Sequence, residues 1–459
     1  MKQHGASVIV AILGSAFGVT LLQVTGALAA ALRGDDVTGS SNTVALLLRI
    51  TAFVFIVIAV YVSAVVTSNT FSTIVAGRVR SIALMRLLGS SARRERGRIA
   101  REGLGVGVVG SLAGGVIGTA VAFGIERAAV ATGVVPPSGY LYNDPVVLIP
   151  IAGVVLTTWA ASWVGSRRVT TVTPLEALGR SEELSREQTL ARSGRNRTAL
   201  VLGILGLLLL VFGVLVGLGS PLGVLIALPG GVLSFTGIVL GADVIMPPVL
   251  RLVGRLSGRS APARLAAENA VRHPQRSSRA TIGLVIGVTL VTMFAVAMAG
   301  FEASIREAQR QQPETYQGID QMLTATTTVF SVLVGFSGLI AAVGLVNNLS
   351  LSVLQRRREL GLLRALGFSR PQVRGMILAE SAQLTFAAVI LGLVLGAFYG
   401  WCGAQSLLGA ASHGIVIPGV PWLSITLVVV AGAILTAVAS WAPARAAVQI
   451  SPIEALAVD

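Results

Sequence analysis

Two stretches of the sequence decide the fold: RVRSIALMRLLG at residues 78–89 and RRRELGLLRALG at residues 356–367. They align without a gap at an offset of 278 residues, which is 356 minus 78. The same offset pairs PLEAL at residues 174–178 with PIEAL at residues 452–456. A register that holds over this distance indicates an internal duplication.

The composition outside these stretches is that of a membrane protein. Hydrophobic residues make up 54% of the chain and charged residues only 12%, whereas a soluble domain has about 25% charged residues. Many apolar runs are long enough to cross a hydrocarbon core of roughly 30 Å. We therefore predict an all-α integral membrane protein with about ten transmembrane helices. They are expected near residues 6–32, 44–72, 103–130, 146–166, 199–217, 222–246, 281–301, 325–353, 376–408 and 422–443.

The arginines predict how the chain lies in the membrane. With the N-terminus in the cytoplasm, most arginines fall in loops on the same side, namely residues 78–101, 167–198, 251–279 and 355–374. The opposite loops hold only Arg33, Arg306 and Arg310. This asymmetry predicts cytoplasmic N- and C-termini. It also explains the net charge of +15 without a nucleic-acid partner. A cleavable signal peptide is the alternative for the first span, although its apolar stretch exceeds the usual h-region.

The spans divide into two units and a connection. Residues 1–180 form the first four-helix unit, and residues 257–459 form the second with a basic cytoplasmic helix before it. Residues 181–256 supply a linker and a two-helix hairpin. Each unit starts and ends on the same side, so the two are parallel repeats. Small-xxx-small spacing predicts close helix packing in both units, at Gly114 and Gly118 and at Gly392 and Gly396.

The duplicated motif reads as a short amphipathic cytoplasmic helix. Apolar residues recur at helical spacing with arginines on other faces, and Gly89 and Gly367 stand where a helix end favours glycine. One interpretation is an interfacial helix whose arginines only set topology. The other is a coupling helix that docks on a cytoplasmic partner, and the duplication favours it. The residues assigned to this contact are Arg80, Leu84, Arg86, Leu88, Gly89, Arg358, Glu359, Leu362, Arg364, Leu366 and Gly367.

No catalytic or metal-binding set stands out in the sequence. Cys402 is the only cysteine, and three histidines are scattered without ligand spacing. Lys2 is the only lysine, and a Walker A phosphate loop needs a lysine late in its motif. We expect this chain to bind no cofactor. If ATP hydrolysis drives the protein, ATP and Mg are bound by another polypeptide.

Three polar residues fall inside or beside apolar spans. Asp243 lies four residues before Pro247-Pro248, and a carboxylate within a span is a functional-site hypothesis by default. The alternative, which we favour, is a hydrogen-bonded or hydrated group near the cytoplasmic end. Asn69 and Asn347 are expected to bond across helices near the inner leaflet.

The quoted segments resemble a known family. RRRELGLLRALGFS at residues 356–369 is similar to the cytoplasmic signature of FtsX-like permeases, the MacB-like, type VII group of ABC transporters. PIEAL at residues 452–456 resembles the family's terminal element, and residues 266–280 resemble the basic helix that precedes a unit. The first unit departs from the pattern, with Ser81 where the second has Glu359.

The resemblance implies a permease subunit, not itself an enzyme, in a bacterial inner membrane. It implies a cytoplasmic ABC ATPase partner, in two copies per chain, and membrane lipid around the helices. The leading hypothesis is export or extraction of an amphipathic, lipid-like or peptide substrate. A second hypothesis is a mechanotransmitter that activates an extracellular lipoprotein or enzyme, with residues 302–324 as its docking site. The third is an ion-coupled secondary transporter that depends on Asp243.

Overall fold

The computed structural model describes most of the helical core. It covers residues 5–33, 84–132, 193–256 and 366–410 throughout, and residues 50–69, 140–166, 265–311 and a few positions at 335, 338 and 422–434 with gaps. All regular structure in this part of the chain is helical. The elements are α1 (Gly5–Arg33), α4 (Ala92–Ala131), the 3₁₀ turn η2 (Pro145–Val147), α5 (Leu148–Gly165), α9 (Ser193–Gly217), α10 (Gly223–Leu240), α11 (Ala242–Leu256), α13 (Pro274–Gln311) and α16 (Arg370–Leu408).

Seven of the described helices are long and apolar enough to cross a membrane. This confirms the predicted all-α membrane protein. The predicted spans 325–353 and 422–443 lie mostly outside the described residues, and an eighth apolar helix, Ile56–Asn69, is described in part. The total of ten spans therefore stays a prediction, as do the exact domain boundaries.

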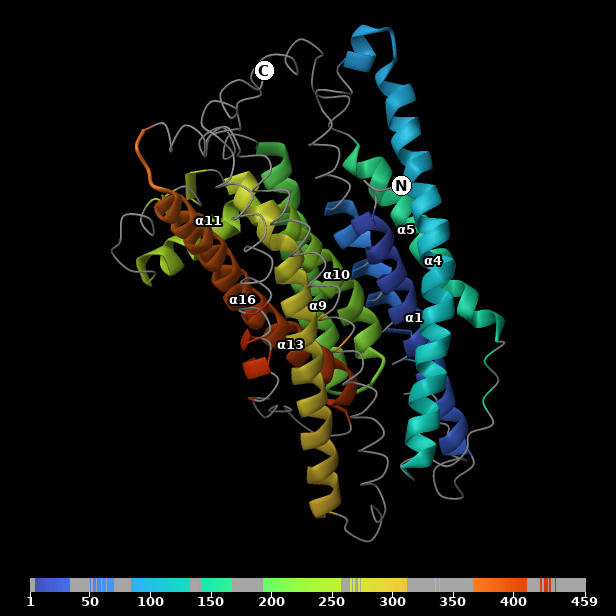
Figure 1. Cartoon of the computed structure of the whole chain (residues 1–459). Coiled ribbons are helices and arrows are strands. Elements are labelled where there is room, and N and C mark those ends of the chain that lie inside the picture. Colours follow the sequence, from blue (N-terminus) through green and yellow to red (C-terminus); the bar gives the residue numbers. More distant parts are fainter. Residues whose placement is uncertain are drawn as a thin grey trace.

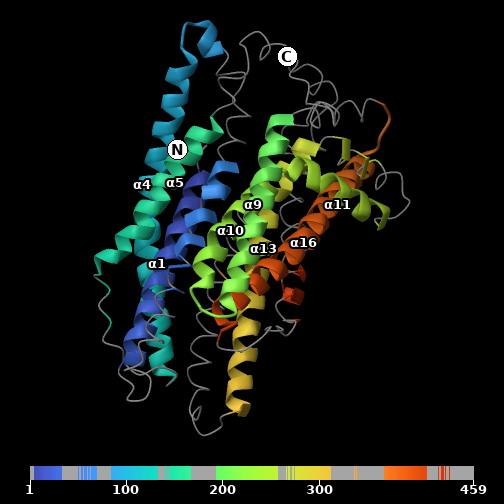
Figure 2. The ribbon, with the colours of Figure 1, turned by 180° about the vertical axis from the view of Figure 1, so that it is seen from behind.

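The helices group as the duplication predicts (Figures 1 and 2). In the first unit α1 packs along α4, and α4 packs on α5; in the second unit α13 packs along α16. The hairpin α9–α10 lies between the units and contacts α16. We call the end where α4 and α16 begin the basic end, because arginines fill the first turns of α4.

Glycines bring the paired helices of each unit together. A Cβ on Gly114 would lie 2.4 Å from the carbonyl oxygen of Ile12, and one on Gly396 would lie 2.5 Å from the Cβ of Thr292. Any larger side chain would separate the helices, so the predicted packing role of these glycines is confirmed.

The same contacts show how the first helices of the two units correspond. Gly114 faces Ser15 of α1, whereas Gly392 faces Val288 of α13. The glycines are 278 positions apart, and the facing residues are 273 apart (288 minus 15). The difference of five residues (278 minus 273) means that the second unit has extra chain between its first helix and the duplicated motif. It explains why the first spans match more loosely in sequence.

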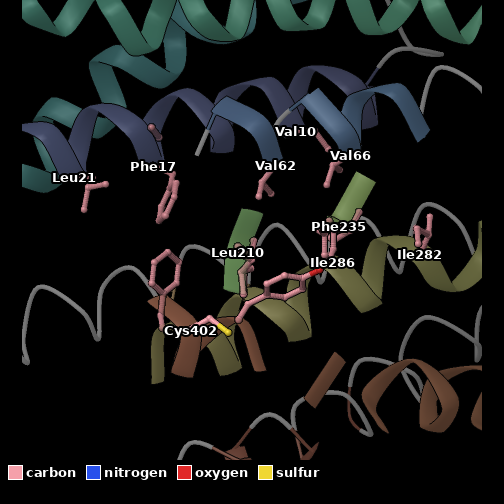
Figure 3. Packing of buried hydrophobic residues seen from close by; sticks show 14 of the residues in the cluster. Val10, Phe17, Leu21, Val62, Val66, Leu210, Phe235, Ile282, Ile286 and Cys402 are labelled. Atoms are coloured by element: carbon pink, nitrogen blue, oxygen red, sulfur yellow. The ribbon is translucent and has the colours of Figure 1, made fainter. Parts of the chain in front are cut away.

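The core lies where the two units and the hairpin meet. Buried side chains from α1, α9, α10, α13, α16 and the partly described helix at 50–69 form one cluster, shown in Figure 3. α1 and α13 are the most buried of the membrane-crossing helices described, and α9 is the least. The first helix of each unit is thus central, and α9 presents a side to lipid.

Two predicted boundaries were wrong. The predicted span 222–246 is two helices, because α10 ends at Leu240 with Gly241 as its cap and α11 begins at Ala242. A sequence window cannot separate two apolar helices joined by a single glycine. The predicted outer loop 302–324 starts as helix, since α13 continues to Gln311 with ion pairs one turn apart along it.

Candidate functional site

The duplicated motif of the first unit forms a tight turn at the basic end. Residues 84–87 are helical, and the amides of Gly89 and Ser90 donate to the carbonyls of Arg86 and Met85 at 3.1 and 3.0 Å. This pair of bonds is a Schellman cap, which requires a left-handed residue at the position of Gly89. Its φ is +98°, a value that only glycine adopts without strain.

A serine then restarts the chain as the next helix. The side chain of Ser91 accepts a hydrogen bond of 3.2 Å from the amide of Arg94 and so caps α4. Such a cap satisfies an amide that the first helical turn leaves unpaired. The result is a short turn, residues 88–91, between the helical residues 84–87 and a helix of 40 residues.

The second unit repeats the left-handed glycine and the serine cap 278 positions later. Gly367 has φ +95°, and Ser369 caps α16. Here the cap is a full capping box with two reciprocal hydrogen bonds. The backbone amide of Gln372 donates to the Ser369 hydroxyl, and the backbone amide of Ser369 donates to the Gln372 side-chain oxygen at 2.9 Å. Pro371 lies in the first turn, where its missing amide costs nothing. The two glycines thus share a left-handed backbone, and the two serines each cap the helix that follows.

Both turns expose a leucine next to the glycine. Leu88 is 83% exposed and Leu366 is 70% exposed, and the two are equivalent positions in the repeat. Leu84, Met85 and Leu87 are about half exposed. Apolar side chains gathered at the end of a bundle, beside arginines, are typical of a protein–protein contact surface. We call residues 84–89 and 366–367 the coupling turns.

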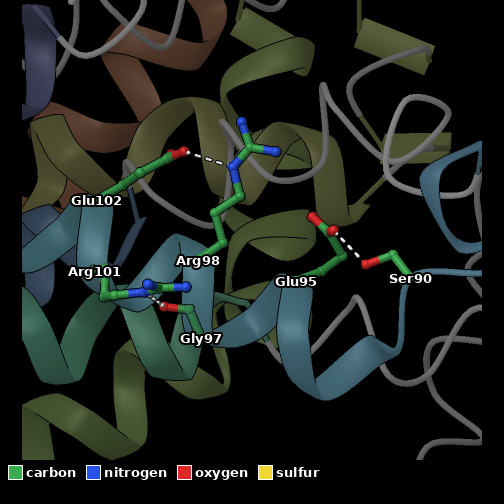
Figure 4. A network of polar contacts seen from close by, with 6 residues as sticks. All are labelled: Ser90, Glu95, Gly97, Arg98, Arg101 and Glu102. Atoms are coloured by element: carbon green, nitrogen blue, oxygen red, sulfur yellow. Dashed lines mark hydrogen bonds and ion pairs between the residues drawn. The ribbon is translucent and has the colours of Figure 1, made fainter.

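Polar contacts hold the first coupling turn to α4 (Figure 4). The Ser90 hydroxyl donates to the Glu95 carboxylate at 2.7 Å, and Glu95 is buried despite its charge. One turn further on, Arg98 and Glu102 form an ion pair at 3.4 Å. The Ser90–Glu95 hydrogen bond thus ties the residue that follows the turn to the start of α4.

Arg96 extends this connection to α5. Its guanidinium lies 4.2 Å from the ring centroid of Trp163 and donates to the Trp163 carbonyl at 3.2 Å. A cation over an indole face is a favourable contact. Two membrane-crossing helices of the first unit are thus joined beside the coupling turn.

Six of the predicted coupling residues are described by the structure. Leu84, Arg86, Leu88 and Gly89 lie in the first turn, and Leu366 and Gly367 lie just before α16. The remaining candidates, Arg80, Arg358, Glu359, Leu362, Arg364 and the intramembrane Asn347, lie outside the described residues. Their assignment to an ATPase contact stays a prediction.

Asp243 is placed differently from the sequence expectation. It lies in the first turn of α11 rather than inside a span, and it is ion-paired with Arg195 of α9. The carboxylate therefore has a charged partner, in agreement with the interpretation of a hydrogen-bonded group at the basic end. Asn69 is half-buried at the end of the partly described helix.

Sequence reasoning missed three functional contacts. Glu95 was not singled out, because nothing in the sequence indicates that a charged residue beside four arginines is buried. The pairing of Arg195 with Asp243 joins residues 48 positions apart, which no local pattern reveals. The Arg96–Trp163 contact had a signal, since both residues recur at the 278-residue offset as Arg374 and Trp441.

The membrane-crossing helices and the two equivalent turns define the class: a multi-pass membrane protein built from two repeats. Comparison with known families gives the class a name: the model of the FtsX-like permease C-terminal domain matches residues 53–174 and again residues 331–452. The two matches begin 278 positions apart, and together they cover more than half of the chain. The chain belongs to the FtsX-like permease family.

Curated relatives agree with this membership. An uncharacterised ABC transporter permease of Methanocaldococcus jannaschii is 30% identical over 130 residues, which is 28% of this chain and 32% of that protein. The permease YknZ of Bacillus subtilis is 32% identical over 31% of this chain and 34% of its own length. The macrolide export ATP-binding/permease protein MacB of Chlorobium luteolum is 33% identical over 30% of this chain and 20% of its own length. The matched region thus spans about a third or less of each relative.

Proposed function

We propose that the protein is the permease subunit of an ABC transporter, driven by a separate cytoplasmic ATPase that docks on the two coupling turns. Its membrane is a bacterial plasma membrane, with the basic end and both termini in the cytoplasm. The ATPase, in two copies per chain, binds the ATP and Mg. Its work moves an amphipathic, lipid-like or peptide compound outward or out of the bilayer.

The observation that carries this proposal is the repeated reversal at the basic end. Gly89 and Gly367 share a left-handed backbone, and an exposed leucine precedes each of them. Two equivalent surfaces on one chain fit two copies of one partner. Export by relatives, such as the macrolide export named for MacB, supports the outward direction.

The test is co-purification of the chain with the ATPase encoded nearest to it, followed by ATPase assays. Leu88→Arg and Leu366→Arg place a charge on the exposed apolar surface of each turn. Each variant should lower complex formation by at least about tenfold, because a partner that covers the turn would bury an unpaired charge. The control is Leu208→Arg, because Leu208 is also exposed, at 62%, but lies on α9 away from the turns. The Leu208→Arg protein that does reach the membrane should keep its affinity for the ATPase. If the unmodified chain forms no nucleotide-dependent complex with the ATPase, the proposal is wrong.

A second candidate function is favoured by the far end of α13. The helix continues to Gln311, and Arg306 pairs with Glu302 and Arg310 with Glu307 along the extension. Such a rigid charged helix suits a mechanotransmitter that activates an external enzyme or lipoprotein. Crosslinking from Glu307 separates the two functions: capture of a cell-wall hydrolase supports mechanotransmission, and lipid or drug adducts support transport.

The third reading, an ion-coupled transporter, has the weakest support. Asp243 is paired with Arg195 at the basic end, which accounts for the carboxylate without an ion pathway. Transport that persists in vesicles lacking any ATPase, and stops in Asp243→Asn, would revive this reading.

A further inference from the structure

A cavity of about 120 Å³ lies at the seam between the two units and the hairpin. Its walls come from the helix at 50–69 of the first unit, from α9 and α10 of the hairpin, and from α13 and α16 of the second unit. The level of Ile286 to Met293 on α13 is well inside the membrane-crossing part of that helix. The cavity therefore lies within the hydrocarbon region, and both units and the hairpin contribute to its walls.

The walls are apolar and uncharged. Two tyrosines line the cavity, but their hydroxyls are engaged by the hairpin: Tyr61 with Thr236 and Tyr399 with Ser234, each at 2.8 Å. Phe235 lies between the two rings, with centroids 6.3 and 5.9 Å away. These contacts hold the wall in place and leave it unsuited to an ion or a sugar.

Thr289 is the exception among the wall residues. It lines the cavity and is 3% exposed, and its hydroxyl has no hydrogen-bond partner among the described residues. A buried hydroxyl normally has a hydrogen-bond partner, so the Thr289 hydroxyl is available to donate to an atom of a ligand. The ligand implied by these walls is a flexible apolar group that carries one hydrogen-bond acceptor.

We infer that this cavity binds an acyl chain of an amphipathic molecule, with the Thr289 hydroxyl donating to a carbonyl oxygen of that molecule. A dry apolar cavity of roughly 150 Å³ is known to hold a benzene-sized group, so this one accommodates a short stretch of alkyl chain. The inference rests on the proposed function for its substrate class. Because three parts of the chain form the walls, displacement of one unit against the other changes the shape of the site.

The chain offers a matched pair of variants for testing the site. Gly403 lines the cavity, and a Cβ on it would meet no atom within 4 Å. Gly403→Leu therefore fills the cavity without a clash at its base and gains helix propensity. Gly203 of α9 is likewise helical with open space around it, but it is not part of the wall. Gly203→Leu is the control.

The experiment uses the full chain in nanodiscs of phosphatidylethanolamine and phosphatidylglycerol. One probe is a phospholipid with a diazirine in an acyl chain, and the other is an N-acylated peptide with the same chain. After illumination, mass spectrometry maps the labelled residues. We expect labels on wall residues such as Met293, an about tenfold loss in Gly403→Leu, and no change in Gly203→Leu.

The outcomes separate each part of the inference. Labelling by the phospholipid alone identifies bilayer lipid as the source of the chain, and labelling by the acyl peptide identifies a transported amphiphile. Absence of wall labels with both probes, or equal labelling in Gly403→Leu, would overturn the site. If Thr289→Val is labelled as strongly as the unmodified chain, the proposed hydrogen bond from Thr289 is wrong. No ATPase or nucleotide is present, so a negative result leaves the proposed coupling to an ATPase intact.

Discussion

The ring of Phe17 in α1 lies beside the ring of Phe294 in α13, with centroids 6.3 Å apart and planes inclined by 55°. Both side chains are fully buried. At the 273-residue correspondence of the two helices, Phe17 is equivalent to Leu290, and Leu21 is equivalent to Phe294. All four side chains belong to one cluster. The first helices of the two units therefore meet in one core, to which both Phe17 and Phe294 and their counterparts in the repeat contribute.

Truncating this contact should loosen the two units. We expect Phe17→Ala to lower the free energy of unfolding by about 3 kcal/mol, the usual cost of removing a buried aromatic ring. Phe294→Ala should cost a similar amount, and the double variant should cost less than the sum because the two rings share one contact. Thermal unfolding of the purified chain in detergent measures all three. Phe212→Ala is the control, since Phe212 is 55% exposed on α9, and an equal loss there would contradict the assignment.

The ion pair between Arg195 and Asp243 should stabilise the junction of α9 and α11. Removing one partner leaves a charge with little water, because the Asp243 side chain is only 10% exposed. We expect Arg195→Met to cost about 1–2 kcal/mol, below the range for fully buried pairs because the arginine is partly exposed. Arg195→Met combined with Asp243→Leu should recover part of the loss. Arg197→Met, on an exposed neighbour, should be neutral in the same melting assay.

The glycines between α13 and α16 should tolerate no methyl group. A Cβ on Gly396 would lie 2.5 Å from the Thr292 Cβ and 2.6 Å from the Thr289 carbonyl oxygen. Gly396→Ala should therefore destabilise the second unit by about 1–3 kcal/mol. Gly375→Ala has open space on the same helix and should be neutral or slightly stabilising, by up to about 1 kcal/mol. A common response of both variants in thermal unfolding would show that packing is not the cause.

Alkaline pH should weaken the end of the first unit opposite the basic end. Burial raises the pKa of the Tyr142 phenol above its usual value of 10, and a hydrogen bond to the Glu126 carboxylate raises it further. The folded chain then keeps this proton at a pH where the unfolded chain releases it. The stabilisation is complete below about pH 10 and is lost as the pH rises toward the folded-state pKa.

Melting curves between about pH 8 and pH 11 test this dependence. Tyr142→Phe should be less stable than the unmodified chain at pH 8, because the hydrogen bond is missing. It should lose less stability than the unmodified chain as the pH rises. An identical decline in both proteins would show that another group is responsible.

The sequence alone predicted the duplicated architecture. Long apolar runs, the one-sided arginines and the 278-residue register are local or repeated patterns, so they are visible without coordinates. The glycines of the two coupling turns were predicted for the same reason, because a left-handed residue at a helix end depends on neighbouring backbone groups. Their positive φ angles, +98° at Gly89 and +95° at Gly367, confirm that prediction.

Only the tertiary structure decided which distant groups meet. The burial of Glu95, the pairing of Arg195 with Asp243, and the meeting of Phe17 with Phe294 depend on how separate helices pack. The sequence also placed Asp243 within a span, because hydropathy averages over a window and does not register the break at Gly241. The seam cavity has no sequence signal, since its walls come from five helices brought together by packing. Periodicity fixes which face of a helix is apolar, whereas the shapes of the facing side chains determine which helix covers it.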